Sequence, residues 1–168
     1  MKGCMAIDRQ KTETVHWHAV FTASRAEKKV RDRLEELGVE CFLPVQTVLR
    51  QWTYRKSRVV VPVIAGLVFV RVGRQEQVKV LQTKGVVAFL RLKGEAGAAV
   101  IPDKQMEDFR FLLDFSEEAV EMTNENIKAG DLVRVVKGSL RGMEGELIRH
   151  KGVTKVLVRI DMLGCAMV

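Results

Sequence analysis

Two groups of basic side chains are the residues in this chain best suited to binding another molecule. The first group surrounds two aromatic residues, Trp52 and Tyr54, and consists of Arg50, Arg55, Lys56 and Arg58. The second group stands where a helix is expected to begin and consists of Arg25, Lys28 and Lys29. Lysine and arginine neutralise phosphate, and aromatic rings stack on unpaired bases, so both groups are candidates for nucleic-acid contact. A solvated loop is an equal alternative for the first group.

Residue patterns that would support catalysis are absent. The sequence has no P-loop, no GxSxG and no HExxH, and the glycines at 138, 142 and 145 lack the Lys-Ser/Thr that a phosphate-binding loop needs. His16 and His18 would share a strand face, but no third metal ligand is near them in the sequence. We therefore predict a protein that is not an enzyme and holds neither cofactor nor metal.

Charge and cysteine content narrow the setting. The chain has 28 Lys and Arg against 21 Asp and Glu, and most of the excess lies before residue 118. A positive field of this kind attracts polyanions. Cys4, Cys41 and Cys165 are odd in number and far apart, which is typical of free thiols in a reducing compartment. No apolar run approaches the roughly 18 residues of a membrane span, so we expect no membrane binding. We also expect a cytoplasmic protein and a monomer.

The first two-thirds of the chain alternate between strand and helix patterns. Residues 16–22 predict a strand on which Trp17, Ala19 and Phe21 share a face, and Ser24 with Glu27 predicts a capping box for a helix that Gly38 ends. Short strands are expected at 39–43, 47–50, 57–61, 63–72 and 85–92. A short helix is expected at 78–83 and a longer one after Pro102. This order predicts an α+β domain with an antiparallel sheet flanked by helices.

The last third of the chain predicts a different, all-β unit. Residues 116–129 are acidic and lack a periodic pattern, as expected of a linker. Short strands follow at 131–136, 145–149 and 154–160, separated by glycine turns, which is the pattern of a small SH3-like β-barrel. We therefore predict a polar tail at 1–14, a first domain at 15–115, a linker at 116–129 and a barrel at 130–168.

The beginning of the predicted barrel resembles a KOW motif. The segment runs from Gly130 to Val135, continues through Lys137-Gly138, and ends with Gly142-Met143-Glu144-Gly145. Gly142 would occupy the turn, where a conformation with positive φ favours glycine. A generic SH3-like barrel is the alternative, because any small barrel needs such glycines.

The first domain resembles the amino-terminal (NGN) domain of NusG-type factors. The strand Ile64–Val70 resembles that family's PGY-x-F-V strand, and four further pieces follow the family's order and approximate spacing: Trp17, Glu27–Val30, Cys41–Pro44 and Lys84–Phe89. With the KOW motif, the resemblance covers residues 15 to 168. It implies a transcription elongation factor that binds RNA polymerase.

Two departures point to a specialised member of that family. Ala65-Gly66-Leu67 stands where much of the family has Pro-Gly-Tyr, and residues 45–63 are rich in arginine. Both features resemble RfaH-like antiterminators and the related regulators of capsular polysaccharide operons. The resemblance thus implies suppression of pausing and termination at particular operons. The alternatives are a housekeeping NusG, and a KOW-containing RNA- or ribosome-binding protein that does not act on polymerase.

The resemblance also implies where partners would bind. An apolar patch of Leu67, Phe69, Leu92 and Met106 would dock on the clamp helices of the largest polymerase subunits, with plain core packing as the alternative. Gln75 and Gln77 would contact the polymerase from the other side of its cleft. The non-template DNA strand would meet Arg25, Lys28, Lys29, Trp52, Arg55 and Lys56. The KOW domain would bind a small-subunit ribosomal protein or Rho.

Overall fold

The chain folds into two β-sheets and a separate two-stranded ribbon. The computed structural model of the chain describes residues 13–115, 120, 122–123, 130–150, 152–160 and 165–167. The first part contains β1 (His16–Thr22), α1 (Glu27–Glu36), β2 (Glu40–Phe42), β3 (Val45–Trp52), β4 (Arg55–Pro62), β5 (Leu67–Val72), α2 (Glu76–Gln82), β6 (Val86–Phe89) and α3 (Asp103–Phe115). The second part contains β7 (Met122–Thr123), β8 (Asp131–Arg134), β9 (Glu144–His150), β10 (Val153–Ile160) and β11 (Cys165–Met167). The predicted α+β class is confirmed.

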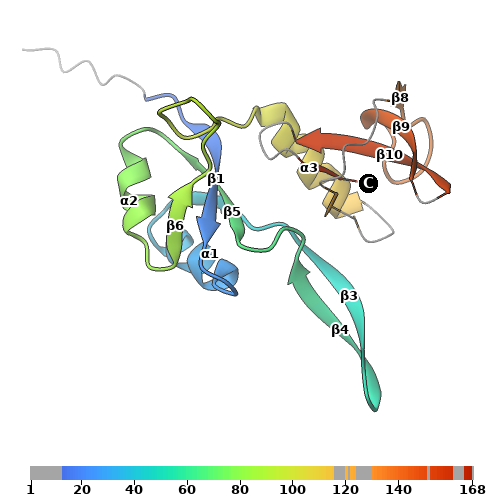
Figure 1. The fold of residues 1–168 in the computed structure, drawn as a ribbon, viewed down its shortest axis with the longest axis horizontal. Coiled ribbons are helices and arrows are strands. Elements are labelled where there is room, and N and C mark those ends of the chain that lie inside the picture. The colour runs from blue at the N-terminus through green and yellow to red at the C-terminus, as the bar shows by residue number, and fades with distance from the viewer. Residues whose placement is uncertain are drawn as a thin grey trace, which may run out of the picture.

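The N-terminal sheet is antiparallel and has helices on both faces. Its strand order is β2-β5-β1-β6 (Figure 1). Side chains alternate between the faces of a strand, and here both faces of β5 are buried. Val68 and Val70 pack in a cluster with residues of α1 and α2, whereas Leu67 and Phe69 pack in a cluster with residues of α3. The sheet is therefore the middle layer of three.

The start of α1 differs from the capping box expected from Ser24 and Glu27. The N-cap position is Ala26, which makes no side-chain capping bond, and Arg25 before it has a φ of 59°. The Glu27 side chain turns inward, where its Oε1 accepts a hydrogen bond of 2.7 Å from the N–H of Gly66. Glu27 thus joins α1 to the turn before β5, and the capping-box prediction is wrong because a tertiary partner holds its carboxylate.

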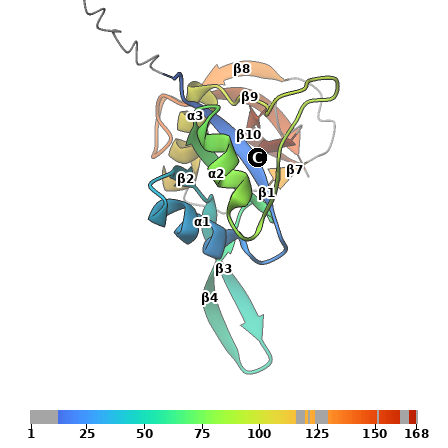
Figure 2. The same ribbon diagram turned by 90° about the vertical axis from the view of Figure 1, so that its left-hand side faces the viewer.

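Strands β3 and β4 pair only with each other and form a long hairpin. The ladder runs from Val45 opposite Pro62 to Trp52 opposite Arg55. Figures 1 and 2 show this ribbon projecting away from the N-terminal sheet. Both strands are longer than the sequence predicted. At its base, Lys28 Nζ donates to the carbonyl oxygen of Val60 at 3.1 Å, which ties the ribbon to the start of α1.

Several other elements are shorter than expected or shifted. The expected strand at 63–72 begins only at Leu67, because Gly66 turns the chain with a φ of 72°. The expected strand at 85–92 is reduced to Val86–Phe89, and α2 begins two residues earlier than predicted, at Glu76. These differences lie at element ends and leave the element order of the first domain as predicted, whereas β7 and β11 in the second part were not predicted.

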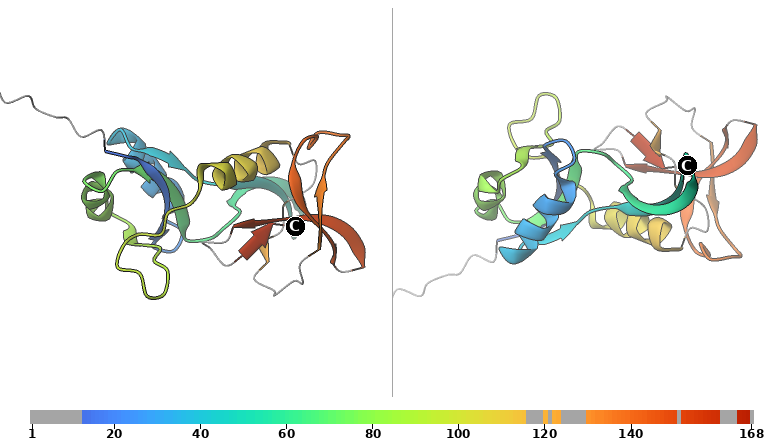
Figure 3. Two further views of the ribbon diagram at one scale, coloured as in Figure 1. Left: turned by 90° about the horizontal axis from the view of Figure 1, so that it is seen from above. Right: turned by 90° about the horizontal axis from the view of Figure 1, so that it is seen from below.

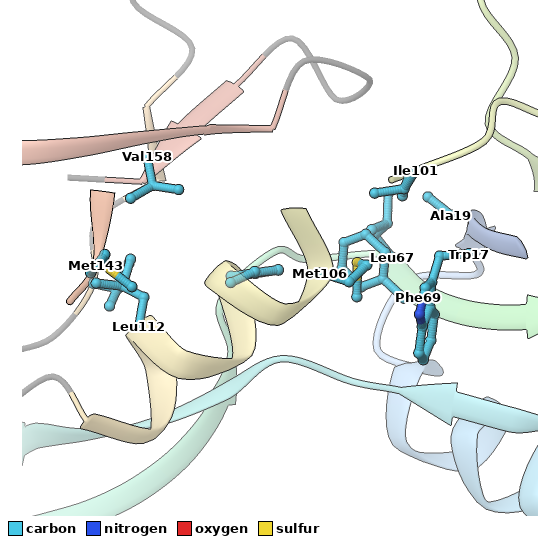
Figure 4. Packing of buried hydrophobic residues seen from close by; sticks show 11 residues of the cluster. Trp17, Ala19, Leu67, Phe69, Ile101, Met106, Leu112, Met143 and Val158 are labelled. Atoms are coloured by element: carbon cyan, nitrogen blue, oxygen red, sulfur yellow. The ribbon is translucent and has the colours of Figure 1, made fainter. Parts of the chain in front are cut away.

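The C-terminal sheet is antiparallel, with strand order β7-β11-β10-β9-β8. Helix α3 lies between it and the N-terminal sheet (Figure 3). Leu112 of α3 packs in one cluster with Met143 and Val158 of the C-terminal sheet (Figure 4). In the predicted linker, Val120 is buried in the same cluster and Met122–Thr123 forms β7; residues 116–119, 121 and 124–129 lie outside the described residues, as do residues 1–12 of the predicted tail.

Candidate functional site

The apolar patch predicted to dock on polymerase lies mostly inside the molecule. Leu67, Phe69 and Met106 come together in the cluster between the sheet and α3, where Phe69 is 0% exposed. The Phe69 ring meets the Phe109 ring of α3 edge to face, with 5.7 Å between centroids. Leu92 is half-buried in the loop after β6 and is not part of this cluster. Three of the four residues predicted to dock on polymerase are therefore part of one cluster in the hydrophobic core.

An apolar side chain next to this core remains in solvent. Phe21 pairs with Leu67 across β1 and β5, so the two side chains share the sheet face that α3 covers. Phe21 is 42% exposed, whereas its partner Leu67 is 4% exposed within the cluster that includes α3. One aromatic side chain beside the buried patch is therefore accessible from solvent. The sequence placed Phe21 on the correct face, but nothing in it indicated where the covering helix ends.

Arg110 is a structural residue that the sequence reasoning missed. Its guanidinium lies over the rings of both Trp17 and Phe42, 4.7 Å from each centroid. Its Nε is buried and has no hydrogen-bond partner. The contact fastens α3 across two strands of the sheet, and cation–π contacts stabilise by up to about 2 kcal/mol when desolvated. No spacing rule relates these three positions in the sequence.

The basic residues form a surface that crosses from α1 to the hairpin. Arg25, Lys28 and Lys29 at the start of α1, and Trp52, Arg55 and Lys56 in the hairpin, are all exposed. The contact between Lys28 and the Val60 carbonyl joins the start of α1 to the base of the hairpin, whose outer end carries Trp52, Arg55 and Lys56. Among the described residues, none of these five cations forms an ion pair with a carboxylate. Within the described part of the chain, the surface is therefore positive.

The two glutamines predicted to meet polymerase point in different directions. Gln75 is exposed at the start of α2, and its backbone N–H donates to Glu13 Oε1 at 2.9 Å. Gln77 is turned inward, with its Nε2 3.5 Å from Nε2 of the buried His18. A hollow of about 480 Å³ opens between Gln77 and the loop at 96–100, and Gln75 does not line it. Gln75 is thus exposed at the surface, whereas Gln77 is half-buried at the wall of the hollow.

His18 is held neutral by its surroundings. Burial lowers the pKa of His18 below its ordinary value of 6.5, against a smaller raising effect of its bond to Ala99. Nδ1 lies 2.8 Å from the Ala99 carbonyl oxygen, so Nδ1 carries the proton and donates it. This leaves Nε2 as the acceptor that faces Gln77. His18 is thus a satisfied core histidine.

Gly142 occupies the tight turn predicted for it. Its φ is 93°, a conformation that side chains disfavour, and its N–H donates to the carbonyl oxygen of Val135 at 2.8 Å. The next residue, Met143, enters the cluster shared with α3. The turn therefore positions the contact between the two sheets.

Metal ligands, membrane-spanning helices and reactive thiols are the other features that bear on a functional site in the described residues. No group of three potential metal ligands occurs in the described part of the chain, and none of its helices is long and apolar enough to cross a membrane. Burial raises the pKa of the Cys41 thiol to about 11, so this cysteine is a poor nucleophile at neutral pH. Cys4 and Cys165 are outside what can be described at side-chain level.

Comparisons with known proteins give one family. The family model described as "Transcription termination factor nusG" matches residues 15–110. The chain is also similar to a structure described as "Domain interaction in Thermotoga maritima NusG", with 22% identity, a TM-score of 0.47 and 92% of each chain covered. A second similar structure, conformation A of an "MjSpt4:Spt5 complex", has 18% identity and a TM-score of 0.29, with 90% of this chain and 97% of that chain covered. Comparison with curated proteins gives no match.

The family match covers the whole N-terminal sheet, its three helices in part or in full, and the basic hairpin. The chain therefore belongs to the NusG family of transcription elongation and termination factors, whose members are not enzymes.

Proposed function

We propose that this chain is a specialised antitermination factor that binds RNA polymerase in the cytoplasm and suppresses pausing and termination at particular operons. The observation that carries the proposal is the pairing of an apolar sheet end at Phe21 with a basic surface at the start of α1. Apolar anchors supply binding energy in a protein interface, and neighbouring cations attract nucleic acid. A protein with both can bridge a polymerase and its DNA.

The docking surface for the polymerase clamp helices is centred on Phe21. Leu67 and Phe69 support it from below, and Met106 holds α3 against them. Leu92 and Gln75 are accessible from other sides of the same domain, and Gln77 acts through its contact with His18. In this arrangement the exposed ring makes the contact, while the buried residues keep the sheet rigid beneath it.

The nucleic-acid partner is the DNA of the transcription bubble. Arg25, Lys28 and Lys29 would meet phosphates of the non-template strand, and the hairpin residues Trp52, Arg55 and Lys56 extend this surface. Support comes from the exposure of all six side chains and from the lack of described carboxylates paired with the cations. Bridging of this kind favours the closed polymerase and lowers the population of the paused state.

The C-terminal sheet is proposed to bind a second partner, a small-subunit ribosomal protein or Rho. Leu132 on its edge strand β8 is 86% exposed, and Val136 after that strand is also exposed. An edge strand with exposed apolar residues is a common surface for partner binding. The tether to the first domain would raise the local concentration of that partner at the polymerase.

The test is retention of the full chain on immobilised clamp helices, followed by transcription of paused complexes. We expect retention of the natural chain and faster escape from pauses. Phe21→Ala is expected to weaken retention by about tenfold or more, as for a central interface aromatic. Leu37→Ala is the matched control, because Leu37 is also exposed but follows α1, whose buried residues pack on the other sheet face.

Three results would contradict the proposal or limit it. A chain that is not retained, yet binds RNA or ribosomes, would be the KOW-containing alternative without polymerase activity. If Phe21→Ala and Leu37→Ala weaken retention equally, the docking surface is not centred on Phe21. Faster escape on every template tested, without preference for any operon, would indicate a housekeeping NusG.

A further inference from the structure

The β3–β4 hairpin carries cations on both of its faces. Directly paired residues of an antiparallel ladder point to the same side, and successive residues alternate. One side, here called the Arg58 face, consists at its outer end of Leu49, Gln51, Lys56 and Arg58. The opposite side, the Arg55 face, consists there of Arg50, Trp52, Arg55 and Ser57. Each face therefore presents two positive side chains.

No described carboxylate neutralises these four cations. None of them forms an ion pair with a carboxylate in the ranges that the structure describes. The sequence itself has no Asp or Glu between Glu40 and Glu76. An anion bound to one face would leave the other two cations without a partner. A site with phosphates on two opposing walls would satisfy all four.

The outer end of the hairpin is free to enter such a site. Tyr54 at the turn is 98% exposed, and Leu49 is 70% exposed. The base of the ribbon is fixed, because Lys28 bonds to Val60 and the Val120 N–H donates to Gln46 Oε1 at 3.0 Å. The ribbon is thus anchored at one end and open at the other (Figures 1 and 2).

The dimensions of the ribbon match one nucleic-acid groove. Strands of eight residues span about 26 Å, and a β-layer with its side chains occupies about 10 Å in the direction from one face to the other. The major groove of B-form DNA is about 12 Å wide and about 8.5 Å deep, and it admits a two-stranded ribbon. The major groove of an RNA duplex is too narrow and deep for side chains to read. A single strand has no opposing walls.

We propose that the hairpin enters the major groove of a B-form DNA duplex. Lys56 and Arg58 meet the phosphates of one groove wall, Arg50 and Arg55 meet those of the other beside Trp52 on the same face, and the turn that carries Tyr54 lies nearest the groove floor. This inference rests on the proposed function, since it places the duplex beside the bubble in a transcription complex. It assigns the start of α1 to the unpaired strand and the hairpin to paired DNA.

The experiment measures binding of the full chain to a labelled DNA duplex of 20 base pairs over a range of salt concentrations. Two double variants remove one face each: Arg50→Gln with Arg55→Gln, and Lys56→Gln with Arg58→Gln. The control is Arg91→Gln with Lys93→Gln, two exposed cations in the loop after β6. Each face variant is expected to lower the slope of log affinity against log salt by about 2, and the control to leave it unchanged.

Two further arms identify the nucleic acid and the groove. The face variants are expected to weaken binding of the DNA duplex more than binding of an unpaired DNA strand or an RNA duplex of the same length. The bound chain is expected to protect guanine N7, which lies in the major groove, from methylation. The inference is overturned if the face variants lose as much affinity for either competitor as for the DNA duplex, if the slope changes in only one face variant, or if N7 is unprotected.

Retention on clamp helices separates this inference from the proposed function. The face variants are expected to be retained like the natural chain, with an unchanged circular dichroism spectrum. Phe21→Ala is expected to bind the duplex normally. Failure of the duplex assay with intact retention refutes the hairpin assignment alone, and failure of retention with intact duplex binding refutes the polymerase docking alone.

Discussion

At the scale of single residues, burial decides which of the apolar side chains can act at a surface. The two-residue period of β5 predicted that Leu67 and Phe69 share a face, and the structure agrees. Their burial depends on where α3 crosses the sheet, and that is a long-range property that no local pattern contains. The same limit explains why Phe21, rather than Phe69, is the exposed ring.

Replacing these two phenylalanines tests the division between core and surface. Phe69→Ala is expected to lower the free energy of unfolding by about 3–5 kcal/mol, because it leaves a cavity in a fully buried cluster. Phe21→Ala is expected to cost only about 1 kcal/mol, since its ring is partly solvated in the folded chain. Urea unfolding of both variants measures the difference. Equal losses would mean that Phe21 is packed as deeply as Phe69.

His18 makes the stability of the fold depend on pH. Its pKa is lowered in the folded chain from the ordinary 6.5, so the unfolded chain binds more protons as the pH falls through that value. The contribution of neutral His18 is therefore complete above pH 6.5 and declines as the pH falls toward the folded pKa. Unfolding by urea at pH 7.5 and pH 5.5 is expected to show a larger loss in the natural chain than in His18→Gln. Identical losses would contradict the assignment.

At the scale of elements, the sequence predicted helices and strands best where a single local pattern determines the element. The period of α1, the proline before α3 and the glycine turns after residue 130 placed those elements within a few residues of their observed ends. The capping box failed because Glu27 found a stronger partner in the Gly66 backbone. The hairpin was underestimated because polar residues such as Gln51 interrupt its apolar alternation, although they pair in the ladder.

Close packing between β9 and β10 gives a prediction for the C-terminal sheet. A Cβ on Gly145 would lie 2.6 Å from Val156 Cγ1 and 2.9 Å from the Leu157 carbonyl oxygen, so Gly145→Ala forces the strands apart. We expect faster amide exchange in β9 and β10 and unchanged exchange in β5. Gly97→Ala is the matched control, because a Cβ there meets nothing within 4 Å and its φ is not positive. Equal exchange in the two variants would show that the strands adapt.

At the scale of the whole molecule, one hydrophobic cluster joins the two sheets. It runs from Trp17 through Phe109 and Leu112 of α3 to Met143 and Val158 (Figure 4). The sequence predicted two domains and a linker, but it gave no sign that α3 would serve both. An amphipathic stripe indicates that one face of a helix packs against other residues. It does not indicate whether those residues belong to the same domain or to the next one.

We expect the two sheets to separate when the part of this cluster that contains Leu112 and Met143 is weakened. Leu112→Ser with Met143→Ser removes two buried apolar side chains, each of which contributes about 1.5–3 kcal/mol when fully buried. The N-terminal sheet keeps Met106 and Phe109 under the variant, and the C-terminal sheet keeps its ladder. We therefore expect a larger radius of gyration by small-angle scattering, with little change in circular dichroism. The control is Leu49→Ser at an exposed position on the hairpin, which should leave the radius of gyration unchanged. If the double variant also leaves the radius unchanged, contacts other than those of Leu112 and Met143 hold the two sheets together.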